Sequence, residues 1–345
     1  MRFGKIKVEN GEVRFSKMMK SCLIPCKDIR WAYYVTDSRE ETKDASVVIL
    51  TKMQKRYQFE MTQSEAASCI SFLKENNKDL IVGYSKGKPL PLNSVFNTRD
   101  LGGMTTNDGR KILPYQLIRS GELYHLSAED ASVLQSEYHL ATVLDFRTEQ
   151  EQMQKPDTVI DGVTYVKNPI FEEAMLGITR EMSPMDMLMQ LGDNPDAYMM
   201  SLYQKIVLDR NSQYYYARFF QHLIDNEEGH AILWHCSVGK DRVGIATMLL
   251  LYALGVPRGE IMDDYMRTNT CQSKEMEYLC RLMKSKDVPD DAIEKMRAVM
   301  SAKECYLQSA ISTIESEYGS MEHYLSRAMC LTAANLTNLK KRYLV

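Results

Sequence analysis

Short segments of alternating apolar and polar residues follow one another through the first 80 residues. KIKVEN and GEVRFS are separated by an Asn-Gly pair, which predicts a hairpin with a tight turn. The next segments have the β-branched and aromatic composition of strands: CLIPC, DIRWAYYV, SVVILTK and RYQFEM. Thr62 and Glu65 then have the spacing of a capping box, which marks a helix start. The apolar face of that helix is predicted to carry Ala66, Cys69, Ile70 and Leu73.

The order of these elements, several antiparallel strands closed by a C-terminal amphipathic helix, resembles the pleckstrin-homology-like (PH-like) fold. We therefore expect a small β-rich domain, a sandwich or barrel with a C-terminal helix, over residues 1–85. Residues 86–94 are rich in Gly, Pro, Lys and Ser, which is typical of a linker. The resemblance predicts a fold and gives no function for this domain.

From residue 95 onward the pattern changes to alternating strands and helices. QLIRSG, ATVLDFR and GVTYVKNP have strand composition, and a helix capped at Ser127 lies between the first two. HAILWHC is continuously apolar, as in a parallel strand buried on both faces. A helix is predicted after Cys236, ending near Gly255, and the rest is mostly helical with a break at Pro289. Residues 95–345 are thus predicted to form an α/β domain with a central, mostly parallel sheet and a helical C-terminal part.

The composition is that of an ordinary globular protein, with 345 residues, 44% hydrophobic and 26% charged. The longest apolar run, Val243–Val256, is too short to cross a bilayer, and the N-terminus has no signal-peptide pattern. Eight cysteines are scattered without a CxxC pair, which favours reduced thiols in the cytoplasm and indicates no zinc site.

The charge is unevenly distributed along the chain. Residues 1–90 carry 17 lysines and arginines against 11 acidic residues, although the whole chain has a net charge of −3. A basic part of this size indicates either weak contact with a membrane surface or an acidic protein, or simply a solvated face. No feature of the sequence indicates a nucleic-acid partner.

The segment WHCSVGKDRVG, directly after the buried strand, is the strongest chemical signal. At a strand-to-helix turn, unpaired N–H groups at the positive end of the helix bind phosphate and stabilise a thiolate such as that of Cys236. Gly239 allows the loop to curl, and Arg242 can bind two phosphoryl oxygens at once. This combination predicts a phosphatase that forms a phosphocysteine. The nucleotide-binding pattern GxxxxGK[ST] fails, because Trp234 and Asp241 stand where Gly and Ser or Thr are needed.

HCSVGKDRVG resembles the HCxxGKDRTG signature of the bacterial tyrosine and lipid phosphatases, a branch of the protein-tyrosine-phosphatase superfamily. Further segments are similar to motifs of this family and occur in the same order: FNTRDLGG (96–103), IRSGEL (118–123), LDFRTEQE (144–151), DYMRTN (264–269) and the C-terminal helices. The resemblance covers about residues 95–345. It implies an α/β cysteine-phosphatase domain without a metal or other cofactor. The substrates it implies are phosphotyrosine proteins, sometimes phosphoserine or phosphothreonine, and phosphoinositides.

By motif match, Cys236 is the nucleophile and Arg242 the phosphate ligand. Asp241 is regarded as catalytically important in this family, and Asp145 is the second acidic candidate. The residues expected around the substrate phosphate are Ser237, Val238, Gly239, Lys240, Asp241 and Arg242. The residues expected to support the site are His235, Asn97, Arg99 and Asp100.

Several roles stay open from the sequence. Asp241 is either the general acid or a residue that orients Arg242, and Asp145 is either the acid or an ion-pair partner of Arg147 or Arg99. Lys240 adds a positive charge that would suit the extra phosphates of an inositol headgroup. Residues 170–228, rich in Met and Tyr, are either a mobile helical lid or core.

One departure from the family pattern supports an alternative function. Val243 stands where the family usually has Thr. The alternative to an active phosphatase is therefore a phosphate-binding adaptor with weak turnover, in which the N-terminal domain recruits a partner.

Overall fold

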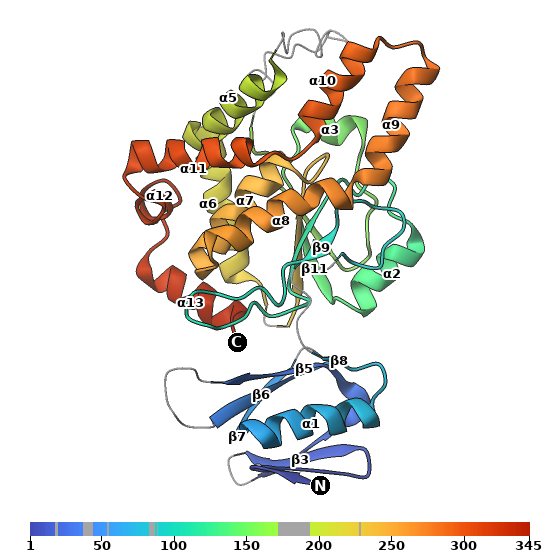
Figure 1. Cartoon of the computed structure of the whole chain (residues 1–345), viewed down its shortest axis with the longest axis vertical. Helices are drawn as coiled ribbons and strands as arrows, with labels where there is room; N and C mark the ends of the chain where they lie inside the picture. The colour runs from blue at the N-terminus through green and yellow to red at the C-terminus, as the bar shows by residue number, and fades with distance from the viewer. Residues whose placement is uncertain are drawn as a thin grey trace. The chain divides into compact units, whose positions relative to one another are not determined.

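The computed structural model describes residues 1–17, 20–36, 44–53, 55–82, 87, 89–171, 194–227 and 229–345. The chain divides into two compact units, Met1–Ser85 and Lys86–Val345 (Figure 1). Each unit has its own hydrophobic core and is described by itself.

The N-terminal unit contains two four-stranded sheets. The first has the order β1 (Arg2–Phe3), β2 (Ile6–Glu9), β3 (Glu12–Lys17) and β4 (Lys20–Pro25), all antiparallel. The second has the order β7 (Arg56–Thr62), β6 (Asp44–Thr51), β5 (Ile29–Thr36) and β8 (Ile81–Val82), in which only β8 is parallel to its neighbour. A short 3₁₀ helix, η1 (Cys26–Asp28), connects the two sheets. The predicted hairpin is confirmed, because Asn10 and Gly11 both have positive φ, 52° and 73°.

One helix, α1 (Gln63–Asn76), completes the N-terminal unit. Its start is the predicted capping box, in which Thr62 accepts from the Glu65 backbone and the Glu65 side chain accepts in return. The predicted apolar face is confirmed as well. The buried residues of the helix are Ala66, Cys69, Ile70 and Leu73.

A five-stranded sheet forms the centre of the larger unit. Its order is β12 (Thr164–Lys167), β11 (Leu140–Asp145), β13 (Ala231–His235), β10 (Leu117–Ser120) and β9 (Arg99–Asp100). The first four strands are parallel, and β9 is antiparallel to β10. This confirms the predicted mostly parallel sheet. β13 lies in the middle and all its residues are buried, as its continuous apolar sequence indicates.

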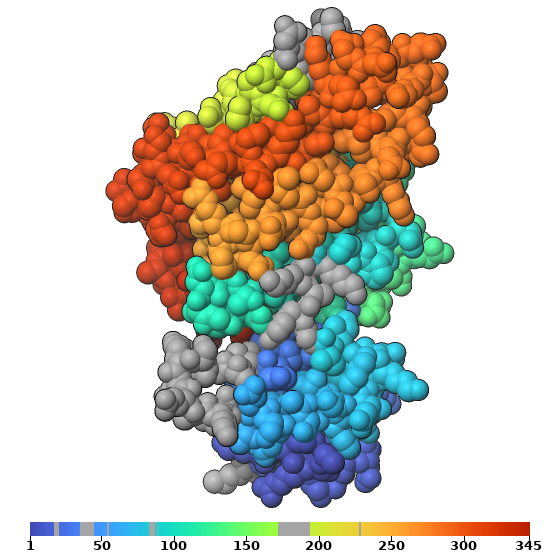
Figure 2. Space-filling view, in the orientation of Figure 1, coloured from blue at the N-terminus to red at the C-terminus, as the bar shows by residue number. Residues whose placement is uncertain are grey.

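Helices make up most of the remaining larger unit. Those before β13 are α2 (Ala128–Ser136), α3 (Glu149–Gln154), α5 (Pro195–Leu208) and α6 (Arg210–Asp225). Those after it are α7 (Asp241–Leu254), α8 (Arg258–Cys271), α9 (Ser273–Ser285), α10 (Asp290–Met300), α11 (Glu304–Tyr318), α12 (Met321–Arg327) and α13 (Ala333–Tyr343). Figure 2 shows the helices that follow residue 258, in orange and red, covering much of one face of this unit.

The predicted helix ends agree with the structure. Ser127 caps α2, α7 ends at Gly255 with a φ of 88°, and Pro289 is the N-cap of α10. Among the described residues, no helix combines the length and the apolar character that a membrane span requires.

The segment that the sequence offered as a lid, 170–228, is described only in part, because residues 172–193 lie outside the described residues. The described helices α5 and α6 contribute to the main core, with Met199, Tyr203, Tyr216 and Phe219 buried. This part of the segment therefore packs as core.

Candidate active site

The loop between β13 and α7 curls around the sulfur of Cys236. The side chain of Cys236 is buried, and the backbone N–H of Gly239 donates to its Sγ over 3.3 Å. Gly239 has a φ of +73°, and a Cβ there would lie 2.5 Å from the carbonyl oxygen of Ser120. Only glycine allows both this backbone conformation and this close approach to the end of β10.

Side chains from two other segments hold the loop carbonyls on its outer side. The Asn97 amide donates to the carbonyl oxygens of Val238 at 2.9 Å and Gly239 at 3.1 Å. Arg119 donates to the Gly239 carbonyl at 2.8 Å. Because C=O and N–H of a trans peptide point in opposite directions, these bonds turn loop N–H groups inward. The loop is thereby organised to bind an anion.

A buried ion cluster supports those two side chains. Asp264 of α8 accepts from Arg99 at 3.0 Å and also from Arg119, and all three are buried. Burial alone would raise the pKa of Asp264, but the two guanidinium groups lower it to about 2. Arg99 also donates to the Asn97 side chain. Asn97 therefore contacts the loop directly, whereas Arg99 is linked to it through Asn97 and Asp264. Sequence interpretation did not single out Arg119 or Asp264.

Asp100 is the last residue of β9. Its carboxylate accepts from the backbone N–H groups of Gly102 at 2.8 Å and Tyr115 at 2.7 Å. These bonds hold the start of the domain together. They involve no residue of the loop at residues 236–242, which is called the phosphate loop below.

Glu151, at the start of α3, holds Arg242. Both carboxylate oxygens of Glu151 accept from the Arg242 guanidinium, at 2.6 and 2.9 Å, and Ser237 Oγ donates to the same carboxylate. Burial would raise the pKa of Glu151, but Arg242 lowers it to about 2. Conversely, burial would lower the pKa of Arg242, and the Glu151 carboxylate raises it above its ordinary value. The guanidinium is therefore fixed in orientation and charge.

Glu151 was present in the motif LDFRTEQE but was not predicted as a site residue. A local signal explains why it was missed. Thr148 and Glu151 form a capping box, which accounts for a glutamate at this position without any distant partner. The same carboxylate caps α3 and reaches Arg242.

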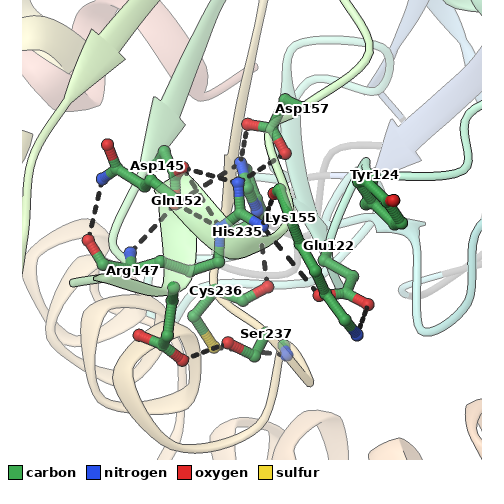
Figure 3. Close-up of polar contacts among 12 residues, drawn as sticks. Glu122, Tyr124, Asp145, Arg147, Gln152, Lys155, Asp157, His235, Cys236 and Ser237 are labelled. Atoms are coloured by element: carbon green, nitrogen blue, oxygen red, sulfur yellow. Dashed lines mark hydrogen bonds and ion pairs between the residues drawn. The ribbon is translucent and has the colours of Figure 1, made fainter. Parts of the chain in front are cut away.

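A second ion cluster lies beside Cys236 (Figure 3). Arg147 donates to both oxygens of Asp145, at 2.9 and 2.8 Å, and to Asp157 at 2.7 Å. His235 Nε2 lies 2.9 Å from the Asp157 carboxylate, and Nδ1 lies 3.4 Å from the carbonyl oxygen of Cys236. Burial would lower the pKa of His235, but Asp145 and Asp157 raise it. The contacts of Asp145 are thus those of an ion-pair partner of Arg147, which is one of the two roles that the sequence left open.

This cluster has the ligand types of a metal site but is already neutralised. Oxygen and nitrogen atoms of Asp145, Asp157 and His235 lie within 4.8 Å of one another. The Arg147 guanidinium binds both carboxylates and occupies the place of a cation. The arrangement therefore fits a structural ion network better than a metal centre.

Asp241 is the first residue of α7, and its carboxylate is hydrogen-bonded by a tyrosine of the hydrophobic core. Tyr203 Oη donates to its carboxylate at 2.7 Å and lies 2.7 Å from Tyr265 Oη. Lys240 Nζ lies 3.2 Å from the same carboxylate. The Lys240 ammonium also donates to the carbonyls of Val299 and Ser301, and its side chain is only 1% exposed. Its contacts thus lie at the end of α10, where it is not displayed to solvent as an extra charge for a headgroup.

Val243 is the third residue of α7, and its side chain is fully buried in the same apolar core as Cys236. Its side chain offers no hydrogen-bond donor to the sulfur.

A buried cysteine under a loop N–H, a fixed arginine six residues later, and a central parallel strand that ends at this loop define a phosphatase domain of α/β type. Residues 90–345 match the model of the tyrosine phosphatase family, and the chain belongs to this family. Residues 1–89 match a domain family of unknown function.

Two curated relatives cover most of the larger unit. A provisionally named tyrosine-protein phosphatase of Cupriavidus necator is 29% identical over 252 residues, 72% of this chain and 86% of the relative. The triple specificity protein phosphatase PtpB of Mycobacterium tuberculosis is 25% identical over 268 residues, 69% of this chain and 92% of the relative. These matches support phosphatase activity.

Proposed function

We propose that this phosphatase hydrolyses phosphotyrosine through a phosphocysteine intermediate, with Cys236 as nucleophile and Arg242 as the phosphate ligand. The observation that carries the proposal is the loop geometry. The Gly239 N–H points at the sulfur, and the outward carbonyls are held by Asn97 and Arg119. The thiolate is the nucleophilic form of cysteine, and this N–H faces the sulfur atom that attacks phosphorus.

The chemistry follows in two steps. The Cys236 thiolate attacks phosphorus, an S–P bond forms, and the P–O bond to the tyrosine breaks as the leaving oxygen takes a proton. Water then attacks phosphorus, the S–P bond breaks, and phosphate and the thiolate are released. Arg242, oriented by Glu151, binds the equatorial oxygens in both steps.

Asp241 is the better supported candidate for the proton donor. Both oxygens of Asp145 bind Arg147, whereas Asp241 begins the helix that follows the phosphate loop. Tyr203 fixes the orientation of the Asp241 carboxylate. His235 and Asn97 position the loop rather than transfer protons.

The substrate range is proposed to centre on phosphotyrosine proteins. A relative is named as a triple specificity protein phosphatase, which supports assays on more than one class of substrate. The motif resemblance adds phosphoserine, phosphothreonine and phosphoinositides to that panel. Phosphoinositides have less support from this structure, because the Lys240 ammonium is buried against backbone carbonyls. A panel of phosphopeptides and phosphoinositide vesicles separates these classes by kcat/KM.

The N-terminal unit is proposed to be a PH-like module that contacts a protein or a membrane surface. Its two sheets and closing helix support the fold, and its excess of basic residues supports an acidic partner. We also propose a cytoplasmic location, since all eight cysteines are free thiols and Cys236 must stay reduced to act.

The mechanism is tested by replacing the nucleophile. We expect Cys236→Ser to abolish hydrolysis of p-nitrophenyl phosphate while vanadate still binds, and acid-quenched wild-type protein to carry phosphate on Cys236 by mass spectrometry. Cys305→Ser, at an exposed thiol, is the matched control and should keep full activity. Substantial turnover by Cys236→Ser would refute the cysteine mechanism.

A further inference from the structure

Four consecutive backbone carbonyls at the end of α10, those of residues 299–302, each accept a hydrogen bond from a side chain of another segment. Gln272 donates to residue 300 at 2.7 Å and Asn269 to residue 302 at 2.8 Å. The Tyr306 hydroxyl lies 3.2 Å from the carbonyl oxygen of residue 298, while its proton is directed to Asp196. Lys240 donates to residues 299 and 301. The last carbonyls of a helix lack partners within the helix and carry its negative end. This row of bonds therefore fixes the junction between α10 and α11, here residues 299–302.

Lys240 is the one donor in that row that belongs to the phosphate loop. Its ammonium lies over the Tyr306 ring, 5.6 Å from the centroid, in addition to its contacts with the two carbonyls. A buried ammonium is stable only where such partners hold it. The backbone of residue 240, between Gly239 and Asp241, is thus tied directly to the α10–α11 junction.

The α9–α10 pair has a small apolar cluster of its own. Its buried members are Cys280, Ile293 and Met296, and they belong to a cluster distinct from the main core. α10 also contacts α5, and Val299 near its end packs against the main core. Helices with fewer buried apolar contacts open locally at a lower free-energy cost than helices inside the core. The hydrogen bonds to the carbonyls of residues 299–302 therefore help to hold α9 and α10 against the rest of the larger unit.

We propose that Lys240 is a positioning residue that couples anion binding at the phosphate loop to docking of the α10–α11 junction. The proposal rests on the proposed function, because it requires that the loop bind a phosphate-like anion. Lys240 then acts through backbone carbonyls and through its ion pair with Asp241, 3.2 Å away, and does not contact the substrate. By linkage, an anion that orders the loop also stabilises the docked junction, and the docked junction raises affinity for the anion by the same factor.

Hydrogen exchange of the wild-type full-length chain gives the first test. Orthovanadate is the probe. If it binds the docked state at least about threefold more tightly, amide exchange in peptides spanning 290–304 should slow by the same factor. Peptides from α1, in the other unit, serve as the internal reference. Vanadate binding and turnover without any change at 290–304 would overturn the inference and leave the proposed function intact. Neither binding nor turnover would overturn both.

Variants then isolate Lys240. Lys240→Met keeps the stem but removes the ammonium, and Gln272→Leu removes a neighbouring donor without touching the loop. Both should speed exchange at the junction. Only Lys240→Met should lose the vanadate response and bind vanadate roughly tenfold more weakly, and Lys240→Arg should restore part of both. A vanadate response that persists in folded Lys240→Met, or vanishes equally in Gln272→Leu, would overturn the inference. If Lys240→Met fails to fold, the wild-type exchange experiment still decides.

Discussion

The sulfur of Cys236 has a defined set of neighbours, and the residue after the arginine is not a donor among them. Gly239 N–H donates to the sulfur, while the Ser237 hydroxyl donates to Glu151. A threonine at position 243 could add a hydroxyl donor that stabilises the departing thiolate in the second step. Valine has nearly the same shape but no hydroxyl.

We therefore expect hydrolysis of the phosphocysteine to limit turnover. One hydrogen bond to a charged group is worth about 1.5–3 kcal/mol, or roughly ten- to a hundredfold in rate. Stopped-flow assays with p-nitrophenyl phosphate should show a burst of product, and Val243→Thr should raise kcat and shrink the burst. Val243→Ala, which adds no hydroxyl, should not raise kcat. A wild-type enzyme without a burst, unchanged by Val243→Thr, would show that this residue has no kinetic role.

The two aspartates differ in their partners, and this predicts different kinetic effects. An alkyl alcohol needs protonation on leaving far more than p-nitrophenol does. Asp241→Asn should therefore reduce kcat/KM for an alkyl phosphate much more than for p-nitrophenyl phosphate. Asp145→Asn, which breaks the pair with Arg147, should affect both substrates alike and lower the Tm. Equal sensitivity of both substrates in both variants would remove each aspartate as the acid.

At the scale of elements, local signals predicted what is local. The Asn-Gly turn, the capping box at Thr62, the continuous apolar strand before Cys236 and the glycine that ends α7 all act within a few residues, and the structure confirms them. Tertiary ion pairs have no such signal. Asp264 meets Arg119 across 145 positions, so no spacing in the sequence indicates it.

The same limit applies to the catalytic loop. Its cysteine, glycine and arginine could be proposed from the sequence because their order within seven consecutive residues is itself a chemical pattern. Glu151 was hidden by its local role as a helix cap, and the direction of the Lys240 side chain depends on where α10 ends. Both facts follow from packing between elements rather than from a motif.

The junction of β9, β10 and α8 depends on Asp264. Removing its charge in Asp264→Asn would leave two buried guanidinium groups facing each other, at a cost of about 3–5 kcal/mol in the free energy of unfolding. Asp263→Asn, at the exposed neighbour, should cost little. Urea unfolding measures both changes. A loss below about 1 kcal/mol for Asp264→Asn would mean that the arginines find other partners.

The pH dependence of this contribution has a defined sign. The pKa of Asp264 is lowered from an ordinary 3.8 to about 2 in the folded protein. Its contribution is therefore fully present above pH 3.8 and is lost as the pH falls toward 2. The stability difference between wild type and Asp264→Asn should shrink over this window, and a constant difference would contradict the assignment.

At the scale of the whole molecule, each of the two units, Met1–Ser85 and Lys86–Val345, has a main hydrophobic core of its own among the described residues. The sequence pattern also changes near residue 90, where short alternating strands give way to buried parallel ones. Composition also differs, with the excess of basic residues confined to the first 90 residues. No sequence motif indicates what the N-terminal unit binds, because its resemblance to the PH-like fold rests on the order of its elements alone.

Deleting residues 1–85 tests whether the larger unit works alone. All residues of the phosphate loop and both ion clusters lie in that unit, so kcat/KM for p-nitrophenyl phosphate should stay within about twofold of the full chain. The Tm of the larger unit should also be retained, because the described residues of its main core run from Leu101 onward. Activity on vesicle-bound or protein substrates should fall if the basic unit recruits them. Loss of folded protein on deletion, measured by circular dichroism and size-exclusion chromatography, would show instead that the two units depend on each other for stability.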